Sequence, residues 1–557
     1  MPHRPNILWV TTHDINPHLG AYASVYPGAE AAVTPNLDRL AEEGVRFDRA
    51  FATAPVCAPA RSSIVTGMFP TAIGTMHMRS RAVPPECVRL LPEYFREAGY
   101  YTTNNWFTDF QMDVPPTVYD DCSPTAHWRN RRDPDQPFFA EFHGSITHES
   151  QLYLDDDTFT ARTAHVADSD RHDPDTVTLP PYHPDTDVFR RSWARYLDLI
   201  TEMDHWVGGI LADLEQDGLA KNTIVVFWSD HGLGMPRAKR WAYDSGLHEP
   251  LIIRWPGVIH PASVHDDLVH IMDLAPTMLT AAGLSVPPHM QAVPLLQENG
   301  WVERPNAYVY GSRDRMDEQE DTSRTVRDRR FRFIRNFHPD RSPMQHCDYP
   351  DQLQTWTELR RLAFTEASQL GRGETPNNLT PTQRRLVAPS KPVEELYDLE
   401  QDPHEITNLV DDPQYTEDLQ RLRAALDEWI ARTGDRGLIP ERELVETWRP
   451  GGRKQVTAAP ILHEAGTQQS ATSSTPGAHV AYTTDPPADV VADPLTAATG
   501  MPVQDGRQWT LLPTGTPMPA TRPLWLKAWR LGYEGSLEVL LEESTSSDKH
   551  EEASVSA

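Results

Sequence analysis

The sequence contains little cysteine. Its 557 residues include only Cys57, Cys87, Cys122 and Cys347, and no two of these form a C-x-x-C pair. Disulfide frameworks need a denser set of cysteines in a shorter chain, and zinc ribbons and dithiol redox enzymes need paired ones. The sequence therefore argues against these three classes of protein, and a cysteine with a chemical role would act singly.

Positive charge and long apolar runs are also scarce. Lys and Arg number 51 against 80 Asp and Glu, a formal net charge of −29, so the surface as a whole should repel nucleic acid and anionic lipid. No stretch approaches the roughly 18 apolar residues of a membrane helix. Residues 1–10 lead straight into a strand-like segment without a leader pattern. We expect no nucleic-acid or membrane partner and a cytoplasmic location, or a periplasmic one if translation starts upstream.

Strand-like apolar runs alternate with helical patterns in the first half of the chain. Apolar residues recur in steps of three and four from Trp193 to Leu214, which predicts a helix, and Thr34 and Pro35 are typical of an N-cap and a first helical residue. A further helix is expected from Arg61. Buried strands are predicted at residues 6–12, 45–51, 138–142, 223–228 and 250–255. This alternation predicts an α/β fold in which a mostly parallel sheet has helices on both faces.

Changes in composition divide the rest of the chain. A more polar region with a half-exposed strand at 332–337 and a helix at 415–433 predicts a smaller α+β subdomain. A Gly-, Ser- and Thr-rich linker, a small β-sandwich and a disordered acidic tail are predicted to follow it. The predicted boundaries follow these changes. The catalytic α/β domain is predicted at residues 1–304 and the subdomain at 305–450. The linker is predicted at 451–475, the sandwich at 476–542 and the tail at 543–557.

The most specific local pattern is Cys57-Ala58-Pro59-Ala60-Arg61, continued by Ser-Ser-Ile-Val-Thr-Gly over residues 62–67. On its own, a C-x-P-x-R string also fits a buried, inert thiol. With its continuation, it resembles the signature of type I sulfatases in the alkaline phosphatase superfamily. The resemblance covers roughly residues 5–445 and implies an alkaline-phosphatase-like α/β fold with a C-terminal α+β subdomain. The final region, at residues 476–485 and 526–533, resembles the small C-terminal β-sandwich of chitobiase-type enzymes.

The sulfatase resemblance implies that Cys57 is oxidised after translation to formylglycine (3-oxoalanine) by a formylglycine-generating enzyme. One hydroxyl of the hydrated aldehyde would attack the sulfur of a sulfate ester, and the other would lose its proton as the aldehyde reforms and sulfate leaves. A divalent cation would ionise the attacking hydroxyl, and the N-terminus of the following helix would add partial positive charge. In this family pattern, Arg61 orients the hydrate.

Two polar clusters follow predicted strands, His13-Asp14 after the first and Asp230-His231 after a later one. The ends of strands are where open α/β sheets place their sites, and carboxylates and imidazoles are metal ligands. Asp14, Asp230 and His231 match the metal-binding positions of sulfatases, together with modified Cys57. His13 stands where the family has an acid. We expect Ca²⁺, with Mn²⁺ or Zn²⁺ as alternatives if His13 ligates.

Further candidates lie on the substrate side. In the stretch from Pro236 to His248, Lys239 matches the family lysine that contacts sulfate, and His248 is a candidate for substrate binding. Arg237 and Arg240 are better explained as part of a solvated basic loop. His148 matches the family histidine that protonates the leaving group, a role suited to its pKa. His77 and Arg79 are candidates for substrate binding, with a structural role as the alternative.

One position departs from the pattern. Residues 104–110, Asn-Asn-Trp-Phe-Thr-Asp-Phe, look like the N-N-x-K-T-D-Y variant of heparan N-sulfatase-like proteins, but Phe107 replaces the lysine. Another residue substitutes for that cation, or activity is weaker, or the substrate differs.

The function expected from these matches is hydrolysis of a sulfate ester or N-sulfate, on a small molecule or a glycan. A phosphonate monoester or phosphodiester hydrolase on the same scaffold is one alternative, and a sugar-binding pseudoenzyme is another. The sequence leaves open the substrate, the metal, the role of the sandwich and the oligomeric state.

Overall fold

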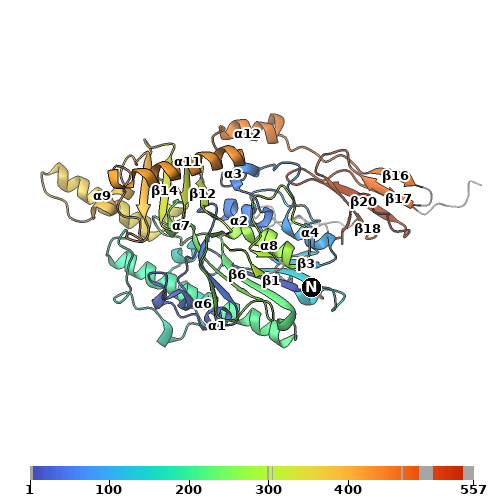
Figure 1. Cartoon of the computed structure of the whole chain (residues 1–557), viewed down its shortest axis with the longest axis horizontal. Helices are drawn as coiled ribbons and strands as arrows, with labels where there is room; N and C mark the ends of the chain where they lie inside the picture. The colour runs from blue at the N-terminus through green and yellow to red at the C-terminus, as the bar shows by residue number, and fades with distance from the viewer. Residues whose placement is uncertain (1–3, 298–299, 304, 466–467, 488–505, 543–557) are drawn as a thin grey trace, which may run out of the picture.

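The computed structural model describes residues 4–297, 300–303, 305–465, 468–487 and 506–542. A central α/β unit lies between two smaller groups of strands (Figure 1). One group, from residues 309–398, lies at one end of the molecule together with a long helix, and the C-terminal strands lie at the other. The tail expected to be disordered, at 543–557, lies outside the described residues.

The central sheet has nine strands in the order β4-β3-β5-β1-β6-β7-β2-β8, with β9 also paired to β2. Strand β7 runs antiparallel to both of its neighbours, and every other pairing is parallel. The expected mostly parallel sheet is therefore confirmed. From β1 to β9, the strands span Asn6–Thr12, Val45–Phe51, Tyr101–Asn105, Asp121–Cys122, Phe138–Gly144, Thr223–Ser229, His248–Arg254, Ser263–His265 and Val269–His270.

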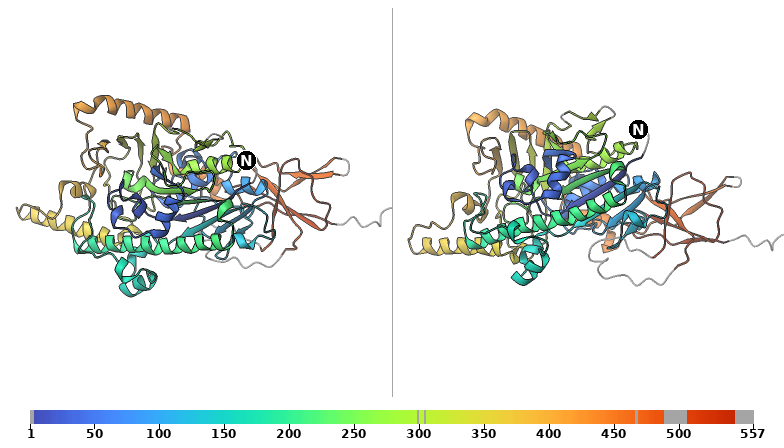
Figure 2. Two further views of the ribbon diagram at one scale, coloured as in Figure 1. Left: turned by 60° about the horizontal axis from the view of Figure 1, so that its bottom comes forward. Right: turned by 90° about the horizontal axis from the view of Figure 1, so that it is seen from below.

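Helices cover both faces of this sheet. Successive side chains of a strand point to opposite faces, so Leu8 and Val10 of β1 join one apolar core while Ile7 and Trp9 join the other. Figures 1 and 2 show α1 (Pro35–Glu42) and the long α6 (Asp187–Gln216) on the first face. The second face carries α2 (Cys57–Thr66), α4 (Leu91–Glu97) and α8 (Leu274–Ala281). The buried strands are apolar in continuous runs because both of their faces are covered.

The N-terminus of α1 is capped by a residue of another helix. Thr34 occupies the predicted N-cap position, but its hydroxyl accepts a hydrogen bond from Gly20 N at 2.8 Å and makes no capping bond. Thr34 is therefore the N-cap residue, as predicted, and Pro35 begins the helix, but the Thr34 side chain makes no capping bond. The free N–H groups of Asn36 and Leu37 donate instead to the carboxylate of Asp204 in α6, at 3.1 and 2.8 Å. A contact between two helices thus satisfies groups that α1 cannot pair itself.

A second sheet follows in the order β12-β13-β14-β15, at Val309–Arg313, Ser323–Arg327, Phe331–Asn336 and Glu394–Asp398, with antiparallel pairings. Helix α11 (Thr416–Thr433), which confirms the helix predicted at 415–433, packs on it. The expectation that the strand near Arg332 is half exposed is wrong, because Arg332 is 1% exposed. Its guanidinium pairs with Asp244 and, at 2.9 Å, with Glu405, which makes burial of this charged residue tolerable.

The C-terminal strands form a four-stranded antiparallel sheet, β19-β18-β20-β21, beside the hairpin β16-β17. The hairpin lies within residues 451–475, the segment predicted to be a linker. Trp509 is 2% exposed and packs on Trp529, so it belongs to the core of this unit. From β16 to β21, the strands span Ile461–Ala465, Gln468–Thr472, His479–Thr483, Thr510–Leu512, Leu524–Trp529 and Val539–Leu541.

The C-terminal unit is attached to loops of the central unit. Gly532 N donates to Asp113 O at 3.3 Å, and Lys454 Nζ pairs with the Asp113 carboxylate at 2.7 Å. Arg530 Nη2 donates to Pro84 O at 3.2 Å. These bonds fix the loop at 81–86 and the segment at 109–113.

The remaining elements are short, apart from one helix at the end of the molecule opposite the C-terminal strands (Figure 2). In the described part of the chain, no helix is both long and apolar enough to cross a membrane. The helices α3, α5, α7, α9, α10 and α12 span Pro70–Ile73, Asp156–Arg162, Asp244–Leu247, Gln354–Gly371, Pro381–Leu386 and Glu441–Trp448, and the strands β10 and β11 span Leu296–Gln297 and Gly300–Trp301.

Replacing the capping carboxylate should loosen α1 locally. We expect Asp204→Ala to speed hydrogen–deuterium exchange of the α1 amides by about 5- to 30-fold, because a lost cap costs about 1–2 kcal/mol. Asp213→Ala, on a partly exposed part of the same helix and paired with Arg129 rather than with α1, is the matched control and should change exchange little. Unchanged α1 exchange in Asp204→Ala would show that the cap is not needed.

Candidate active site

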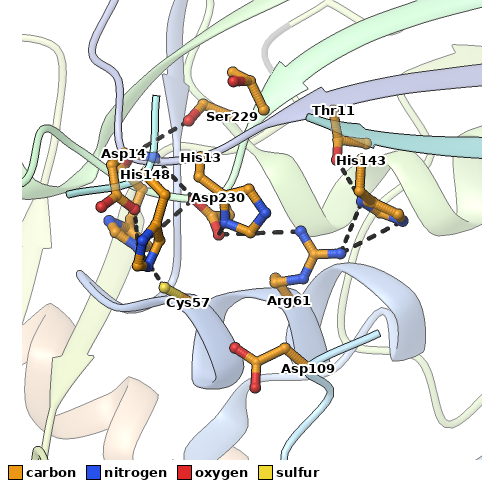
Figure 3. Close-up of polar contacts among 12 residues, drawn as sticks. Thr11, His13, Asp14, Cys57, Arg61, Asp109, His143, His148, Ser229 and Asp230 are labelled. Atoms are coloured by element: carbon orange, nitrogen blue, oxygen red, sulfur yellow. Dashed lines mark hydrogen bonds and ion pairs between the residues drawn. The ribbon is translucent and has the colours of Figure 1, made fainter. Parts of the chain in front are cut away.

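The carboxyl ends of three neighbouring parallel strands, β5, β1 and β6, meet at one edge of the central sheet. Thr12 at the end of β1 pairs with Gly144 on one side and Ser229 on the other. The chain leaves these strands as His13-Asp14 and Asp230-His231, so the topology brings together the two polar clusters singled out in the sequence. Figure 3 shows the side chains of His13, Asp14 and Asp230 gathered over Cys57.

Asp14 is held in a strained turn. Its backbone is left-handed, with φ 54°, a conformation that Asp adopts more readily than most residues. Its Oδ2 accepts hydrogen bonds from Glu149 N at 2.7 Å and Lys239 Nζ at 2.9 Å, and its Oδ1 lies 3.2 Å from His231 Nε2. Asp14 and Asp230 are both fully buried. Several positive groups are therefore required around them.

Cys57 faces these carboxylates from the start of α2. The helix begins at Cys57 rather than at Arg61, the start expected from the sequence, and Val56 before it is extended. Cys57 is 4% exposed, and its Sγ lies 3.2 Å from His231 Nε2. The first residue of a helix lies in partial positive charge, which favours a negative group at this position.

The charge around Cys57 favours the thiolate. Burial alone would raise the pKa of the Cys57 thiol. The positive charges of Lys239 and His231, with hydrogen bonds from His13 and His148, outweigh burial and hold that pKa well below its ordinary value. A low pKa is typical of cysteines with chemical roles, whereas an inert buried thiol has a raised one.

The donor atoms fit a divalent cation. One ligand atom each from His13, Asp14, Cys57 and Asp230 lies within 4.8 Å of the others, and all four residues are buried. Asp14 Oδ1, Asp230 Oδ2 and His13 Nδ1 are buried and make no hydrogen bond. Buried polar atoms are rarely left this way unless an ion or water completes them. Two carboxylates with imidazole and sulfur donors suit a metal of intermediate hardness.

The two histidines are oriented differently. His231 Nδ1 lies 2.9 Å from Gly232 O, which can only accept, so the nitrogen facing Asp14 and Cys57 is Nε2, free to ligate in the neutral ring. His13 Nδ1 lies 3.1 Å from Asp230 Oδ2, close enough for an ion pair but without hydrogen-bond geometry. Burial would lower the pKa of His13, but Asp230 raises it to about 9.

Lys239 and Arg240 come from the loop after β6, and both are buried. Lys239 Nζ lies 2.9 Å from Asp14 Oδ2 and 2.9 Å from Glu149 Oε1. Arg240 binds both oxygens of Glu149, at 2.8 and 2.9 Å. The expectation of a solvated loop is therefore wrong for Arg240, and also for Arg237, which is 2% exposed. Paired acids allow these cations to be buried.

Arg61 is held by hydrogen bonds from its guanidinium, and one of its terminal nitrogens has no hydrogen-bond partner. Its Nε donates to Thr108 O at 3.0 Å and its Nη2 to Phe107 O at 3.2 Å, and Nη2 also lies 2.9 Å from His143 Nδ1. The remaining nitrogen, Nη1, is buried without a hydrogen bond and lies 4.0 Å from Asp230 Oδ2. The guanidinium is therefore oriented with one free donor directed at the metal-ligand cluster.

Phe107, at the position of the family lysine, packs between positive groups. Its ring centroid lies 5.3 Å from that of His13 and 5.3 Å from the guanidinium carbon of Arg61. An aromatic face attracts cations without carrying charge itself. The groups that lower the pKa of Cys57 are Lys239 and the nearby histidines.

His148 is half-buried beside the cluster. The backbone N–H of Ser150 donates to its Nδ1 at 3.3 Å, so in the neutral ring the proton is on Nε2. Its ring contacts that of His13, with centroids 5.8 Å apart. A proton-bearing Nε2 near Cys57 is the arrangement that a proton donor needs.

His77 and Arg79 lie on the next loop. His77 is buried, its Nδ1 accepts from Arg315 N at 3.4 Å, and burial lowers its pKa to about 4. The Arg79 side chain is 59% exposed and pairs with Asp109. Burial would lower the pKa of Arg79, but Asp109 and the charge of Cys57 raise it. Arg79 is thus within electrostatic reach of the cluster and open to solvent.

His248 lies elsewhere. Its ring packs on Phe51 at 4.7 Å and on Tyr26 at 5.2 Å, and its Nε2 lies 2.9 Å from Asp48 O. In the described part of the chain its side chain therefore contacts the core near Phe51 rather than Cys57.

Sequence reasoning passed over some residues of the site. Glu149, which directly follows His148, is the acid that pairs with the basic loop. Glu141 and His143 of β5 lie 3.2 Å apart, and His143 holds Arg61. Polar residues at alternate positions of an otherwise apolar strand were the available signal, because they mark one face of the strand.

Comparisons with known proteins place the chain in a family. A family model described as "Sulfatase" matches residues 5–284. A second, "N-sulphoglucosamine sulphohydrolase, C-terminal", matches residues 232–354, in keeping with the heparan N-sulfatase-like motif near Phe107.

Individual proteins are also similar. The chain is 38% identical to an ulvan-active sulfatase of Formosa agariphila over 86% of this chain and 84% of that protein. A solved structure in complex with its substrate D-glucosamine-2-N,6-O-disulfate has a TM-score of 0.53 at 18% identity, covering 79% of this chain and 100% of that one. The phosphonate monoester hydrolase of Agrobacterium radiobacter has a TM-score of 0.57 at 16% identity, covering 78% and 97%. The two structures show a shared fold only.

Removing one buried carboxylate should weaken metal binding strongly. We expect Asp230→Asn to bind divalent cations far more weakly than the wild type in calorimetric titration. Loss of a residue that only hydrogen-bonds to a metal ligand lowers metal affinity roughly 10- to 100-fold, and loss of a ligand should lower it more. Elemental analysis of the purified proteins gives the bound metal and its identity.

Asp266→Asn, at an exposed aspartate outside the cluster, is the control and should bind like the wild type. Equal affinity in Asp230→Asn and the wild type would place the metal site elsewhere.

Proposed function

Because this chain belongs to the sulfatase family and is a sulfuric ester hydrolase, we propose that it removes a sulfate ester or N-sulfate group from a sulfated glycan. Water enters the reaction, and inorganic sulfate and an alcohol or amine leave it. The observation that carries the proposal is the low-pKa, buried Cys57 at the start of α2, opposite two buried aspartates.

The proposed substrate class rests on the relatives. One is named for its activity on ulvan, and a structure of the same fold holds a disulfated glucosamine as its substrate. Both names describe sulfated carbohydrates. The exposed guanidinium of Arg79, next to the cluster, is a suitable donor for such a polyanionic substrate in a chain of net charge −29.

We assign the nucleophile to Cys57 after its conversion to formylglycine by a formylglycine-generating enzyme. Support comes from the C-x-P-x-R pattern and from the position of residue 57, where the helix N-terminus, Lys239 and the histidines favour negative charge. When formed, the hydrated aldehyde supplies an oxygen nucleophile toward sulfur and a second hydroxyl for release of sulfate.

The metal would be held by His13, Asp14, Asp230 and residue 57, whose ligand atoms lie together, with His231, whose Nε2 lies 3.2 Å from Asp14 Oδ1, as a further candidate. When bound, a divalent cation lowers the pKa of an oxygen nucleophile and neutralises charge. Ca²⁺ is expected from the family pattern, and the nitrogen donors make Mn²⁺ or Zn²⁺ the alternatives.

The other side chains of the site would bind the sulfate group, orient the nucleophile and supply a proton. Lys239, with Nζ between Asp14 and Glu149, is placed to neutralise a sulfate oxygen. Arg61 directs its free Nη1 toward the nucleophile side of the cluster. His148 holds a proton on Nε2 that it can give to the leaving oxygen or nitrogen.

Release of inorganic sulfate tests the proposal. Protein from a host that makes formylglycine is given sulfated oligosaccharides, and Cys57→Ala is compared with the wild type. We expect kcat/KM to fall by about a thousandfold or more, because loss of a covalent nucleophile removes most of the rate enhancement.

Cys122→Ala is the matched control, since Cys122 is equally buried but lies in β4. It should keep activity within a few-fold of the wild type. A phosphonate monoester is assayed in parallel, because the fold is shared with such a hydrolase. Faster turnover of the phosphonate than of every sulfated substrate, or equal sulfate release by Cys57→Ala, would contradict the proposal.

A further inference from the structure

A small cavity lies outside the active-site cluster, where the loop after β6 meets the second sheet. Figure 1 shows α7, at the end of this loop, beside β12 and β14. The cavity has a volume of about 80 Å³ and is lined by side chains of the loop, of the sheet and of α10. A single water needs about 10–15 Å³ by the same measure, so there is room for a small polyatomic ion.

Arg237 forms one wall of this loop–sheet cavity and is fixed there. Its guanidinium carbon lies 3.9 Å from the centroid of the Tyr243 ring and 4.6 Å from that of Tyr182. Its Nη2 donates to Glu405 O at 2.5 Å. The other terminal nitrogen, Nη1, is buried and makes no hydrogen bond. A buried guanidinium with an unsatisfied donor is costly unless a partner completes it.

Arg313 of β12 forms another wall, and its guanidinium also has an N–H group without a hydrogen-bond partner. It is 7% exposed, and its Nε is buried without a hydrogen bond. Its Nη1 lies 3.0 Å from Asp321 Oδ2, and Lys391 Nζ lies 3.0 Å from the same oxygen. One carboxylate therefore pairs with two cations, and its single negative charge neutralises only one of the two positive charges.

The lining as a whole is positive. Its four cationic side chains outnumber its two acidic ones, namely Arg237, Arg313, Arg385 and Lys391 against Glu395 and Glu405. The Glu395 carboxylate already accepts hydrogen bonds from the hydroxyls of Tyr243 and Tyr397, at 2.8 and 2.6 Å. A positive, partly unsatisfied cavity in a chain of net charge −29 is complementary to an anion.

We propose that the loop–sheet cavity binds a small tetrahedral oxyanion, sulfate or phosphate, through Arg237 Nη1 and Arg313 Nε. Guanidinium N–H groups bind such oxygens through charge-assisted hydrogen bonds. Arg237 is two residues before Lys239 in the loop, so the anion would also fix the loop that delivers Lys239 and Arg240 to the active site. This inference does not rest on the proposed reaction.

The test is calorimetric titration of the full chain with sodium sulfate, and separately with sodium phosphate, at constant ionic strength set by NaCl. The Lys239→Ala protein is used to remove sulfate binding at the active site. We expect it to bind one or both anions. Preference for one identifies the anion, and equal affinity shows a general oxyanion site.

Arg313→Gln and Lys391→Gln, each in the Lys239→Ala background, should weaken binding by about 10-fold or more, because each removes a charge-assisted donor or a charge. Lys391 also lines the cavity, so its variant serves if Arg313→Gln does not fold. Arg361→Gln, in the same background, changes an exposed arginine on α9 by the same charge and should bind like its Lys239→Ala parent.

Failure of both anions to bind a Lys239→Ala protein that circular dichroism shows to be folded like the wild type would overturn the proposal, as would undiminished binding by both cavity variants. Neither result bears on sulfate release by the wild type. Conversely, loss of sulfate release in Cys57→Ala leaves anion binding in the cavity untouched.

Discussion

The burial of two carboxylates at the ends of adjacent parallel strands is the constraint around which the site is built. Asp14 and Asp230 are fully buried, and an uncompensated buried charge would cost several kcal/mol. Compensation comes from every side, from His13 and His231 in the same turns, Lys239 in the loop after β6, and the metal that the donor set fits.

The positive groups around the two aspartates also favour the thiolate form of Cys57. The cations that neutralise the aspartates lower the pKa of the thiol, and the start of α2 adds its partial charge. Phe107, where the sequence pattern predicts a lysine, lies in the same positive surroundings. Its ring packs between His13 and Arg61, so an apolar residue fits within a shell that is already positive.

Much of this was predictable because it depends on local pattern. The strand at 45–51 was located residue for residue, and the strand ends predicted where Asp14 and Asp230 would meet. The rest depends on partners distant in sequence. Capping of α1 by Asp204, burial of Arg332 against Asp244, and pairing of Glu149 with Lys239 and Arg240 arise only from tertiary packing. Residue propensities predicted Thr34 at the N-cap and a half-exposed strand at 332–337. They contain no information about contacts between residues that are distant in sequence.

The central claim is that residue 57 acts as formylglycine, and mass spectrometry of the tryptic peptide spanning residues 50–61 tests it most directly. In protein from a host with an active formylglycine-generating enzyme, the peptide should be lighter by about 18 Da than the unmodified sequence. The peptide containing Cys122 should show no such loss. A peptide 50–61 that carries only unmodified cysteine under these conditions would contradict the account.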